Sequence, residues 1–478
     1  MFKLKTLSLS LLVLCSSASL AQNNLSQNKP FKPTEKPPLS SDTRAPVESD
    51  AAQLFRRVDY YLTQYYRGPT QVKVDRLLEE TRVRLQRSCG KNVRCTFSTA
   101  EKFIRPMIAA LKDAHTYLMP PIENRFWSRY EEYRMGVNLR PYMNAGARVV
   151  VNLWRGGAAD QVGIRRGDVI LRINGVKPGA FVPNPNRSNR LNVLLERRGS
   201  YFTRTLNTRA WEPENDLPSL SVRGKVGILK IPTFYEDSYD GNEIGREVHR
   251  LIGQANARRL ERLVVDVRDN GGGQLTNCMV AANAFVPQLG YKLRHALADL
   301  SFTYKTGVLT LGGNDLVQNR LFFQQQEERT QPYARWNKPV AVLVNEETAS
   351  CGEIFAYLLQ KVGRGPIIGE KTYGVSNSAT RYFGLPGDYA MGVTIGQLHN
   401  FDGSRLPAFI TPNILVKDDL ELLNKRGWDG ALERGILETS RRQLETLNLN
   451  RHYPQPHIVG HPLFPVPELC SSLLLHSS

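Results

Sequence analysis

The chain has 478 residues, of which 41% are hydrophobic, and a formal net charge of +18. This length and apolar content suffice for one large domain or two to three ordinary ones, and they exclude a fibrous or wholly disordered protein. The basic residues are scattered rather than clustered with aromatic residues, which argues against a nucleic-acid partner and favours a solvated basic surface.

The first 21 residues are typical of a secretory signal. Lys3 and Lys5 precede a short apolar run, and Ala21 ends a stretch of small residues suited to cleavage. We therefore expect residues 1–21 to be removed and the mature chain to begin near Gln22, in the periplasm or outside the cell. No segment reaches the roughly 20 apolar residues that a transmembrane helix needs.

Composition and periodicity divide the mature chain into segments. Residues 22–50 are rich in Pro, Ser and Asn, which predicts a flexible linker. Residues 51–130 repeat apolar side chains at three-to-four spacing, which predicts a helical domain. Residues 131–210 contain β-branched strands and an Asn-Gly turn, which predict a small β-rich domain. Residues 211–440 alternate strands and helices, as in an α/β sheet, and 441–478 form a tail.

Individual elements of the α/β region can be placed from their apolar runs. The expected strands are Val226–Ile231, Leu263–Val267, Val340–Val344 and Pro366–Ile368, and the expected helices are Gly241–Ala255, Leu275–Phe285 and Gly352–Val362.

Five of the six cysteines remain once Cys15 leaves with the signal. Cys89 and Cys95 flank a short turn-like segment, and in an oxidising compartment we expect them to form a local disulfide. No second Cys or His pair stands at a zinc-ligand spacing beside them, so we expect neither a metal nor a cofactor.

Two strands of the α/β region run into polar, glycine-containing turns that open helices. The first turn is Asp-Asn-Gly-Gly-Gly at 269–273, whose glycines let N–H groups face an anion or a carbonyl oxygen. No Lys-Ser/Thr follows these glycines, which disfavours a nucleotide loop.

The second turn places Ser350 at the start of a helix. An isolated serine there most often only caps the helix. The adjacent N–H groups can also stabilise an oxyanion once the hydroxyl attacks a carbonyl group. We interpret the next residue, Cys351, as a backbone donor rather than a thiol nucleophile.

A serine nucleophile also needs a base, and Asp113-Ala114-His115-Thr116 offers a histidine. A lone histidine is more often structural than catalytic. The sequence around His115 therefore leaves both interpretations open.

Taken together, these motifs resemble peptidase family S41, the C-terminal processing and tricorn-type serine peptidases. The resemblance implies an α/β (α+β multidomain) protein with an N-terminal helical region, a PDZ-like domain and a ClpP/crotonase-like catalytic core. The motifs that carry it follow the family order: Gly157–Gly175, which resembles a PDZ domain, Asp266–Gly273, Asn345–Ile354, Gly369–Gly374 and Thr411–Ile414.

The resemblance implies a role for individual residues. Ser350 occupies the nucleophile position, and the N–H groups of Gly272 and Cys351 would form the oxyanion hole. A peptide-binding groove would begin the PDZ-like domain, at Gly136, Val137, Asn138 and Leu139.

The general base separates two branches of the family. The processing branch has a lysine 25 residues after the serine, where this chain has Val375. The tricorn-like branch has a histidine in an Asp-x-His setting, which His115 matches. We therefore expect His115 to be the general base.

The third catalytic member is not found at its family position. The branch's glutamate position holds Leu406 in this chain. Asp402, Asp388 and Glu353 remain as substitutes, and we prefer Asp402 because it lies near an expected strand end.

The expected function is an exported serine endopeptidase that cleaves peptide bonds in unfolded or tail-exposed polypeptides. The alternative is a catalytically silent protein that binds peptides or a hydrophobic ligand, which the missing acid and lysine favour. Hydrolysis of a non-protein ester or amide is a third hypothesis. The sequence leaves open whether the protein forms a homo-oligomer.

Overall fold

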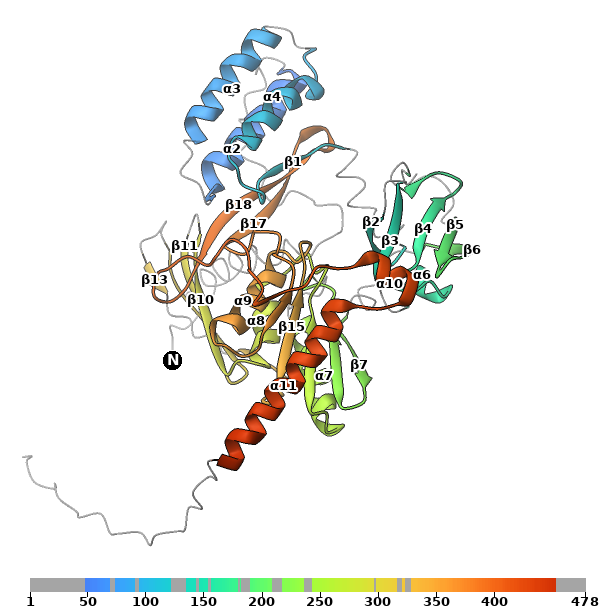
Figure 1. Ribbon diagram of the computed structural model, residues 1–478. Helices are drawn as coiled ribbons and strands as arrows, with labels where there is room; N and C mark the ends of the chain where they lie inside the picture. Colours follow the sequence, from blue (N-terminus) through green and yellow to red (C-terminus); the bar gives the residue numbers. More distant parts are fainter. Residues whose placement is uncertain are drawn as a thin grey trace, which may run out of the picture.

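A computed structural model describes residues 48–452 with internal gaps (Figure 1). The expected signal, most of the linker and most of the tail lie outside the described residues. The undescribed ranges are 1–47, 69–73, 91–93, 122–134, 143–145, 154–155, 179–180, 182–189, 209–216, 236–242, 296–297, 316–319, 323–327 and 453–478.

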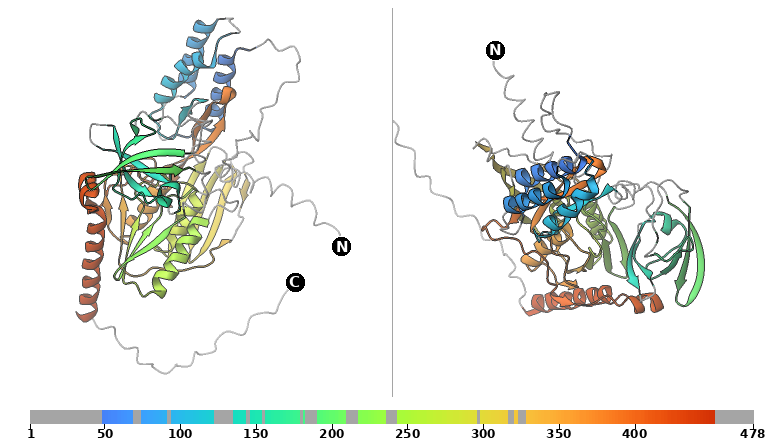
Figure 2. Two further views of the ribbon diagram at one scale, coloured as in Figure 1. Left: turned by 90° about the vertical axis from the view of Figure 1, so that its right-hand side faces the viewer. Right: turned by 90° about the horizontal axis from the view of Figure 1, so that it is seen from above.

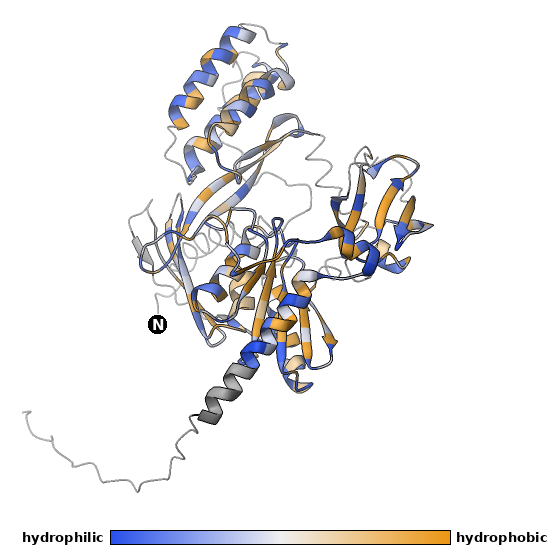
Figure 3. Ribbon diagram, viewed as in Figure 1, coloured by the Kyte–Doolittle hydropathy of each residue, from blue (hydrophilic) through white to orange (hydrophobic). Residues whose placement is uncertain are grey.

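Three amphipathic helices form the N-terminal unit: α2 (Asp50–Tyr65), α3 (Val74–Cys89) and α4 (Phe97–Ala109). Hydrophobic and hydrophilic residues alternate along them (Figure 3), and the apolar ones, such as Leu54 and Ile104, are buried between the helices. As the sequence predicts, the structure joins Cys89 and Cys95 by a disulfide, with Cα atoms 5.6 Å apart.

A hairpin from the core supports these helices. It consists of β17 (Ser378–Gly384), the 3₁₀ turn η3 (Pro386–Asp388) and β18 (Ala390–His399), and the short strand β1 (Tyr117–Met119) pairs with β18. The ring of Tyr61 on α2 stacks on Phe383 at 4.2 Å between centroids. The helical unit and the hairpin therefore share one hydrophobic cluster.

A five-stranded antiparallel sheet forms a separate unit, with strand order β2-β3-β4-β5-β6. Asn174 and Gly175 both have positive φ, so the predicted Asn-Gly turn follows β4. The strand β2 lies at an edge of the described sheet. The elements are β2 (Val137–Tyr142), β3 (Ala147–Leu153), α6 (Ala158–Gln161), β4 (Val169–Ile173), β5 (Arg190–Arg197) and β6 (Ser200–Asn207).

The core contains a mostly parallel sheet with order β19-β16-β15-β9-β8-β7, in which only β7 runs antiparallel to its neighbour. Its four inner strands are mostly buried, as helices cover both faces, whereas the edge strands β7 and β19 are partly exposed. The strands are β7 (Ser219–Arg223), β8 (Val226–Lys230), β9 (Arg262–Asp266), β15 (Val340–Val344), β16 (Ile367–Gly369) and β19 (Ile414–Leu415).

Helices α7 (Glu243–Ala257), α8 (Leu275–Asn283) and α9 (Cys351–Lys361) pack within the main hydrophobic cluster. The helix α11 (Gly430–His452) covers the other face and lies along the outside of the core (Figure 2). Before it, α10 (Leu420–Arg426) contacts the five-stranded unit, since Asn424 donates to the Gly167 carbonyl.

A second, antiparallel core sheet has the order β1-β18-β10-β11-β12-β13, with β14 and β17 attached. Its remaining strands are β10 (Gln288–His295), β11 (Ala298–Lys305), β12 (Val308–Asp315), β13 (Arg320–Phe322) and β14 (Glu328–Arg329).

The structure confirms the expected α/β multidomain fold. Each strand and helix placed individually in the α/β region is present within two residues of its expected ends. The antiparallel sheet was not predicted, because its strands lie in stretches without a clear apolar run.

Candidate functional site

Ser350 lies between the end of β15 and the first residue of α9. Its backbone has φ 50° and ψ −116°, a conformation that side-chain-bearing residues rarely adopt. Such a strained residue costs about 1–3 kcal/mol and persists only where its surroundings hold it. Ser350 is therefore both the cap of α9, in a capping box with Glu353, and a residue with a strained backbone.

Glu353 holds the Ser350 backbone in this conformation. Its carboxylate is fully buried and accepts the Ser350 N–H at 2.9 Å. It also accepts the N–H groups of Gly374 and Val375 and the hydroxyl of Thr372. Burial raises the pKa of Glu353, although these hydrogen bonds oppose the shift. Glu353 therefore acts as a clamp, not as a partner of the histidine.

The glycine turn approaches Ser350 closely. A Cβ on Gly272 would lie 2.7 Å from Ser350 Cβ and 3.1 Å from the Cys351 nitrogen, so only glycine fits there. The Ala349 N–H donates to the Asn270 carbonyl, which joins the two turns.

The contacts of Gly272 correct one expectation. Its N–H donates to Asn270 Oδ1 at 2.9 Å, so it is already engaged and is not a free oxyanion donor. Gly273 forms a parallel bridge with Phe234, in which Phe234 makes both hydrogen bonds, to the Gly272 carbonyl and from the Gln274 N–H, so the Gly273 N–H takes no part in it. Among the described hydrogen bonds, the N–H groups of Gly273 and Cys351 have no acceptor.

Cys351 forms a disulfide with Cys278 of α8, with Cα atoms 5.7 Å apart. Its sulfur is therefore not a thiol, which argues against a thiol nucleophile at this position. This pairing could not be predicted from the sequence, because the cysteines are 73 residues apart and no local turn joins them.

His115 lies in the turn between α4 and β1. Its backbone N–H donates to Asp113 Oδ1 at 3.1 Å, and Asp113 also accepts the hydroxyl of Thr116. Its ring Nδ1 lies 2.7 Å from the hydroxyl oxygen of Ser378, the first residue of β17. Burial lowers the pKa of His115 to about 4, although Asp113 opposes the shift.

The segment from Thr372 to Ser378 joins the surroundings of Ser350 to those of His115. Thr372, at its start, donates to Glu353, which also accepts the Ser350 N–H. Ser378, at its end, forms a hydrogen bond with the His115 ring. Tyr117, two residues after His115, has its pKa raised by burial and further by Tyr382 and Tyr373.

Asp402, the preferred acid, has a different role. It is exposed in the turn after β18, and its Oδ1 accepts the N–H of Ser404 at 2.8 Å and the Ser404 hydroxyl. The described partner of His115 Nδ1 is Ser378 and not Asp402. Asp388 lies in η3, whose Gly387 packs against Phe97.

The expected peptide-binding residues begin the edge strand β2. Gly136 has φ 75°, and a Cβ there would lie 3.1 Å from the Gly157 Cα. The N–H of Ala159 in α6 donates to the carbonyl of Met135, just before the strand. Val137, Asn138 and Leu139 pair with β3 on one side only.

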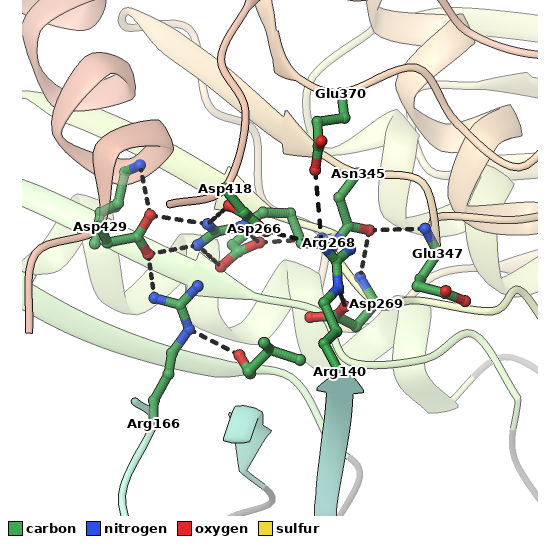
Figure 4. A network of polar contacts seen from close by, with 12 residues as sticks. Arg140, Arg166, Asp266, Arg268, Asp269, Asn345, Glu347, Glu370, Asp418 and Asp429 are labelled. Carbon is green, nitrogen blue, oxygen red and sulfur yellow. Dashed lines mark hydrogen bonds and ion pairs between the residues drawn. The ribbon is translucent and has the colours of Figure 1, made fainter. Parts of the chain in front are cut away.

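A buried network of charges lies at the carboxyl ends of the parallel strands (Figure 4). Arg268, directly after β9, donates to Asp266 and Asp429. Burial opposes ionisation of Asp429, but Arg268 and Arg166 lower its pKa to about 2.

The network also reaches the five-stranded unit. Arg166 from that unit donates to Asp429, at 2.5 Å. Arg140 of β2 lies 3.7 Å from Asp269 and 3.4 Å from Asp418. Charged contacts therefore join β2, the strand that carries the candidate peptide-binding residues, to the core (Figure 4).

Within the described ranges, no group of His, Cys, Asp or Glu side chains is suited to hold a metal ion. Among the helices that the structure describes, none combines the length and the apolar content needed to cross a membrane.

Two family models match the sequence. Residues 225–416 match "Peptidase family S41" and residues 127–180 match "PDZ domain". The first range holds Ser350 and the glycine turn, and the second overlaps the five-stranded unit.

The relatives are processing proteases. The chain is 24% identical to carboxyl-terminal-processing peptidase 1, chloroplastic, of Arabidopsis thaliana, over 70% of this chain and 65% of the relative. It is 26% identical to the carboxyl-terminal-processing protease of a Picosynechococcus strain, over 63% of this chain and 69% of the relative. The match thus spans about two thirds of each relative's length.

A solved structure of mature CPAF covers 84% of this chain and 98% of its own, with a TM-score of 0.46 and 15% identity. On these family models, residues 225–416 form a domain of peptidase family S41, and a PDZ domain precedes it.

Proposed function

We propose that this chain is an exported serine endopeptidase that cleaves unfolded or tail-exposed polypeptides. The observation that carries the proposal is the strained backbone of Ser350, held by Glu353 and set against the Gly272 turn. A helix cap alone needs neither the strain nor the close approach.

In the proposed reaction, Ser350 Oγ attacks the substrate carbonyl while His115 Nε2 takes the hydroxyl proton. The N–H groups of Cys351 and Gly273 stabilise the oxyanion, in place of the pair Cys351 and Gly272. His115 then returns the proton to the leaving amine, and water hydrolyses the acyl-enzyme by the same route. No metal or cofactor takes part in these steps.

Ser378 replaces the missing acid in this proposal. When Nδ1–H of His115 donates to Ser378 Oγ, the lone pair remains on Nε2, where the reaction needs it. A neutral hydroxyl orients the ring but adds no negative charge, in accord with the low pKa of His115.

The edge strand β2 supports the choice of substrate. An extended peptide can add to an exposed sheet edge by main-chain hydrogen bonds. Folded proteins rarely present a free extended segment, whereas unfolded chains and tails do. We therefore propose that Gly136–Leu139 bind such segments ahead of cleavage.

Labelling with a fluorophosphonate probe tests the proposal. Wild type, Ser350→Ala and His115→Ala would be compared, alongside digestion of a denatured protein and of the same protein folded. We expect labelling and digestion by wild type only, with the denatured substrate preferred. Folded wild type that neither labels nor digests would overturn the proposal and favour a peptide-binding protein.

A further inference from the structure

The disulfide between Cys278 and Cys351 lies at the centre of the proposed site. Both side chains are fully buried. Cys351 directly follows Ser350, and Cys278 stands in the first turn of α8, which begins just after the Gly271–Gly273 turn. The Cys351 sulfur also lies 3.1 Å from the Gln274 carbonyl oxygen. The bond thus joins the two segments that carry the proposed nucleophile and oxyanion donors.

We propose that this disulfide positions the oxyanion site and makes catalysis depend on oxidation of the pair. The inference rests on the proposed function and adds its regulation. It assigns Cys278 as a positioning residue, since Cys278 acts through Cys351 and touches no reacting atom.

Reduction of the disulfide increases the distance that the two sulfur atoms need. Bonded sulfurs lie about 2 Å apart, whereas non-bonded heavy atoms need roughly 3.5–4 Å. A dithiol reductant would supply two electrons and two protons, cleave the S–S bond into two thiols and itself become a cyclic disulfide. The freed sulfurs must then separate by roughly 1.5–2 Å inside a close-packed interior.

To make room for the separated sulfurs, α8 and α9 must move apart, because both sulfurs are packed in the main hydrophobic cluster. Gly272 lies so close to Ser350 that a Cβ added to it would be only 2.7 Å from Ser350 Cβ. A misplacement of about 1 Å can lower a rate roughly a hundredfold. We therefore expect the reduced enzyme to keep its fold and lose kcat, with KM little changed, because an oxyanion donor acts mainly in the transition state.

The chain carries its own matched control. The disulfide Cys89–Cys95 lies in the helical unit, far from Ser350 in the sequence. It belongs to a different hydrophobic cluster from Cys278 and Cys351. The double variants Cys278→Ala/Cys351→Ala and Cys89→Ala/Cys95→Ala each remove one disulfide and leave the other. A reductant then acts on a known single bond in each.

The experiment uses the chain without residues 1–21, produced in a reducing cytoplasm and assayed before and after oxidation. Thiol alkylation and mass spectrometry would establish the state of each pair, and circular dichroism would check the fold. Peptidase kcat and KM and fluorophosphonate labelling would be measured in both states.

We expect oxidation to raise kcat roughly ten- to a hundredfold in wild type and in the Cys89/Cys95 variant. Renewed reduction should reverse the gain. The Cys278/Cys351 variant should give the same kcat under both conditions.

The inference would be overturned if wild type had the same kcat in two samples, one with the Cys278–Cys351 bond shown to be reduced and one with it shown to be intact. A Cys278/Cys351 variant that still responds to oxidation would also overturn it. Oxidised wild type without labelling would instead refute the proposed function itself.

Discussion

The ring Nδ1 of His115 lies 2.7 Å from the hydroxyl oxygen of Ser378, a residue 263 positions further along the chain. Their contact depends on β1, which follows His115 and pairs with β18, and on β17, which begins at Ser378 and pairs with β18 from the other side. In the proposed mechanism, a buried strand residue therefore occupies the position where a serine peptidase commonly has a carboxylate.

Ser378→Ala should lower kcat/KM about ten- to a hundredfold, because the ring loses the acceptor that fixes its tautomer and orientation. Steady-state kinetics on a peptide substrate would measure the loss. Thr380→Ala is a matched control, since its hydroxyl stands two residues later on β17 and has no described partner. Equal losses in both variants would show that a general disturbance of β17, and not the contact with His115, controls the rate.

The pH dependence follows from the low pKa of His115. The ring must be neutral to accept a proton, so a pKa of about 4 predicts full activity down to about pH 5 and an acid limb of kcat/KM near pH 4. An unperturbed histidine would place this limb near pH 6.5. Ser378→Asp should move the limb upward, because a carboxylate at Nδ1 favours the charged ring. If the acid limb of kcat/KM stays at the same pH in Ser378→Asp, the side chain at position 378 does not control the pKa of the general base.

The parallel core could be predicted from the sequence, because its strands are unbroken apolar runs. Val340–Val344 was expected and is found with the same bounds. The turn after this strand carries Ser350, so its place at a helix start could be predicted as well. The backbone strain of Ser350 could not, since it depends on the buried Glu353 and its partners in a distant segment.

Contacts between distant segments were the features that the sequence did not reveal. Ser378 stands in no motif, and the pairing of both β1 and β17 with β18 brings it to His115. Cys89 and Cys95 could be paired because they flank one turn, whereas Cys278 and Cys351 meet through the packing of α8 on α9. Gly272 was taken for an oxyanion donor, and the Asn270 side chain engages its N–H instead.

Glu353→Gln should destabilise the protein and reduce labelling of Ser350. All the described partners of the carboxylate are donors, and an amide would turn its own N–H groups toward some of them. Donors left without an acceptor in a buried site predict a loss of roughly 2–4 kcal/mol in the free energy of unfolding. Denaturant unfolding and probe labelling would measure the two effects.

Glu347→Gln is the control for that change, because Glu347 is exposed in the turn before Ser350. It should match wild type in both measurements. If Glu353→Gln also matched wild type, Glu353 would not be the clamp that holds Ser350.

Arg268→Met should destabilise the junction between the core and the PDZ domain. Arg268 is buried between Asp266 and Asp429, and its loss removes a cation from both buried carboxylates, which keep Lys230 and Arg166 as partners, at a cost of about 3–5 kcal/mol. In wild type, the lowered pKa of Asp429 contributes stability that is present above about pH 4 and lost as the pH falls toward 2. Without Arg268, burial should raise the pKa of both carboxylates, so the variant should recover part of its deficit as the pH falls from 7 to 5. Denaturant unfolding at both pH values would measure this recovery, with Arg56→Met in the exposed pair with Glu48 as the control that shows no such trend. A deficit in Arg268→Met that is the same at pH 7 and pH 5 would mean that lost packing, and not uncompensated charge, destabilises the variant.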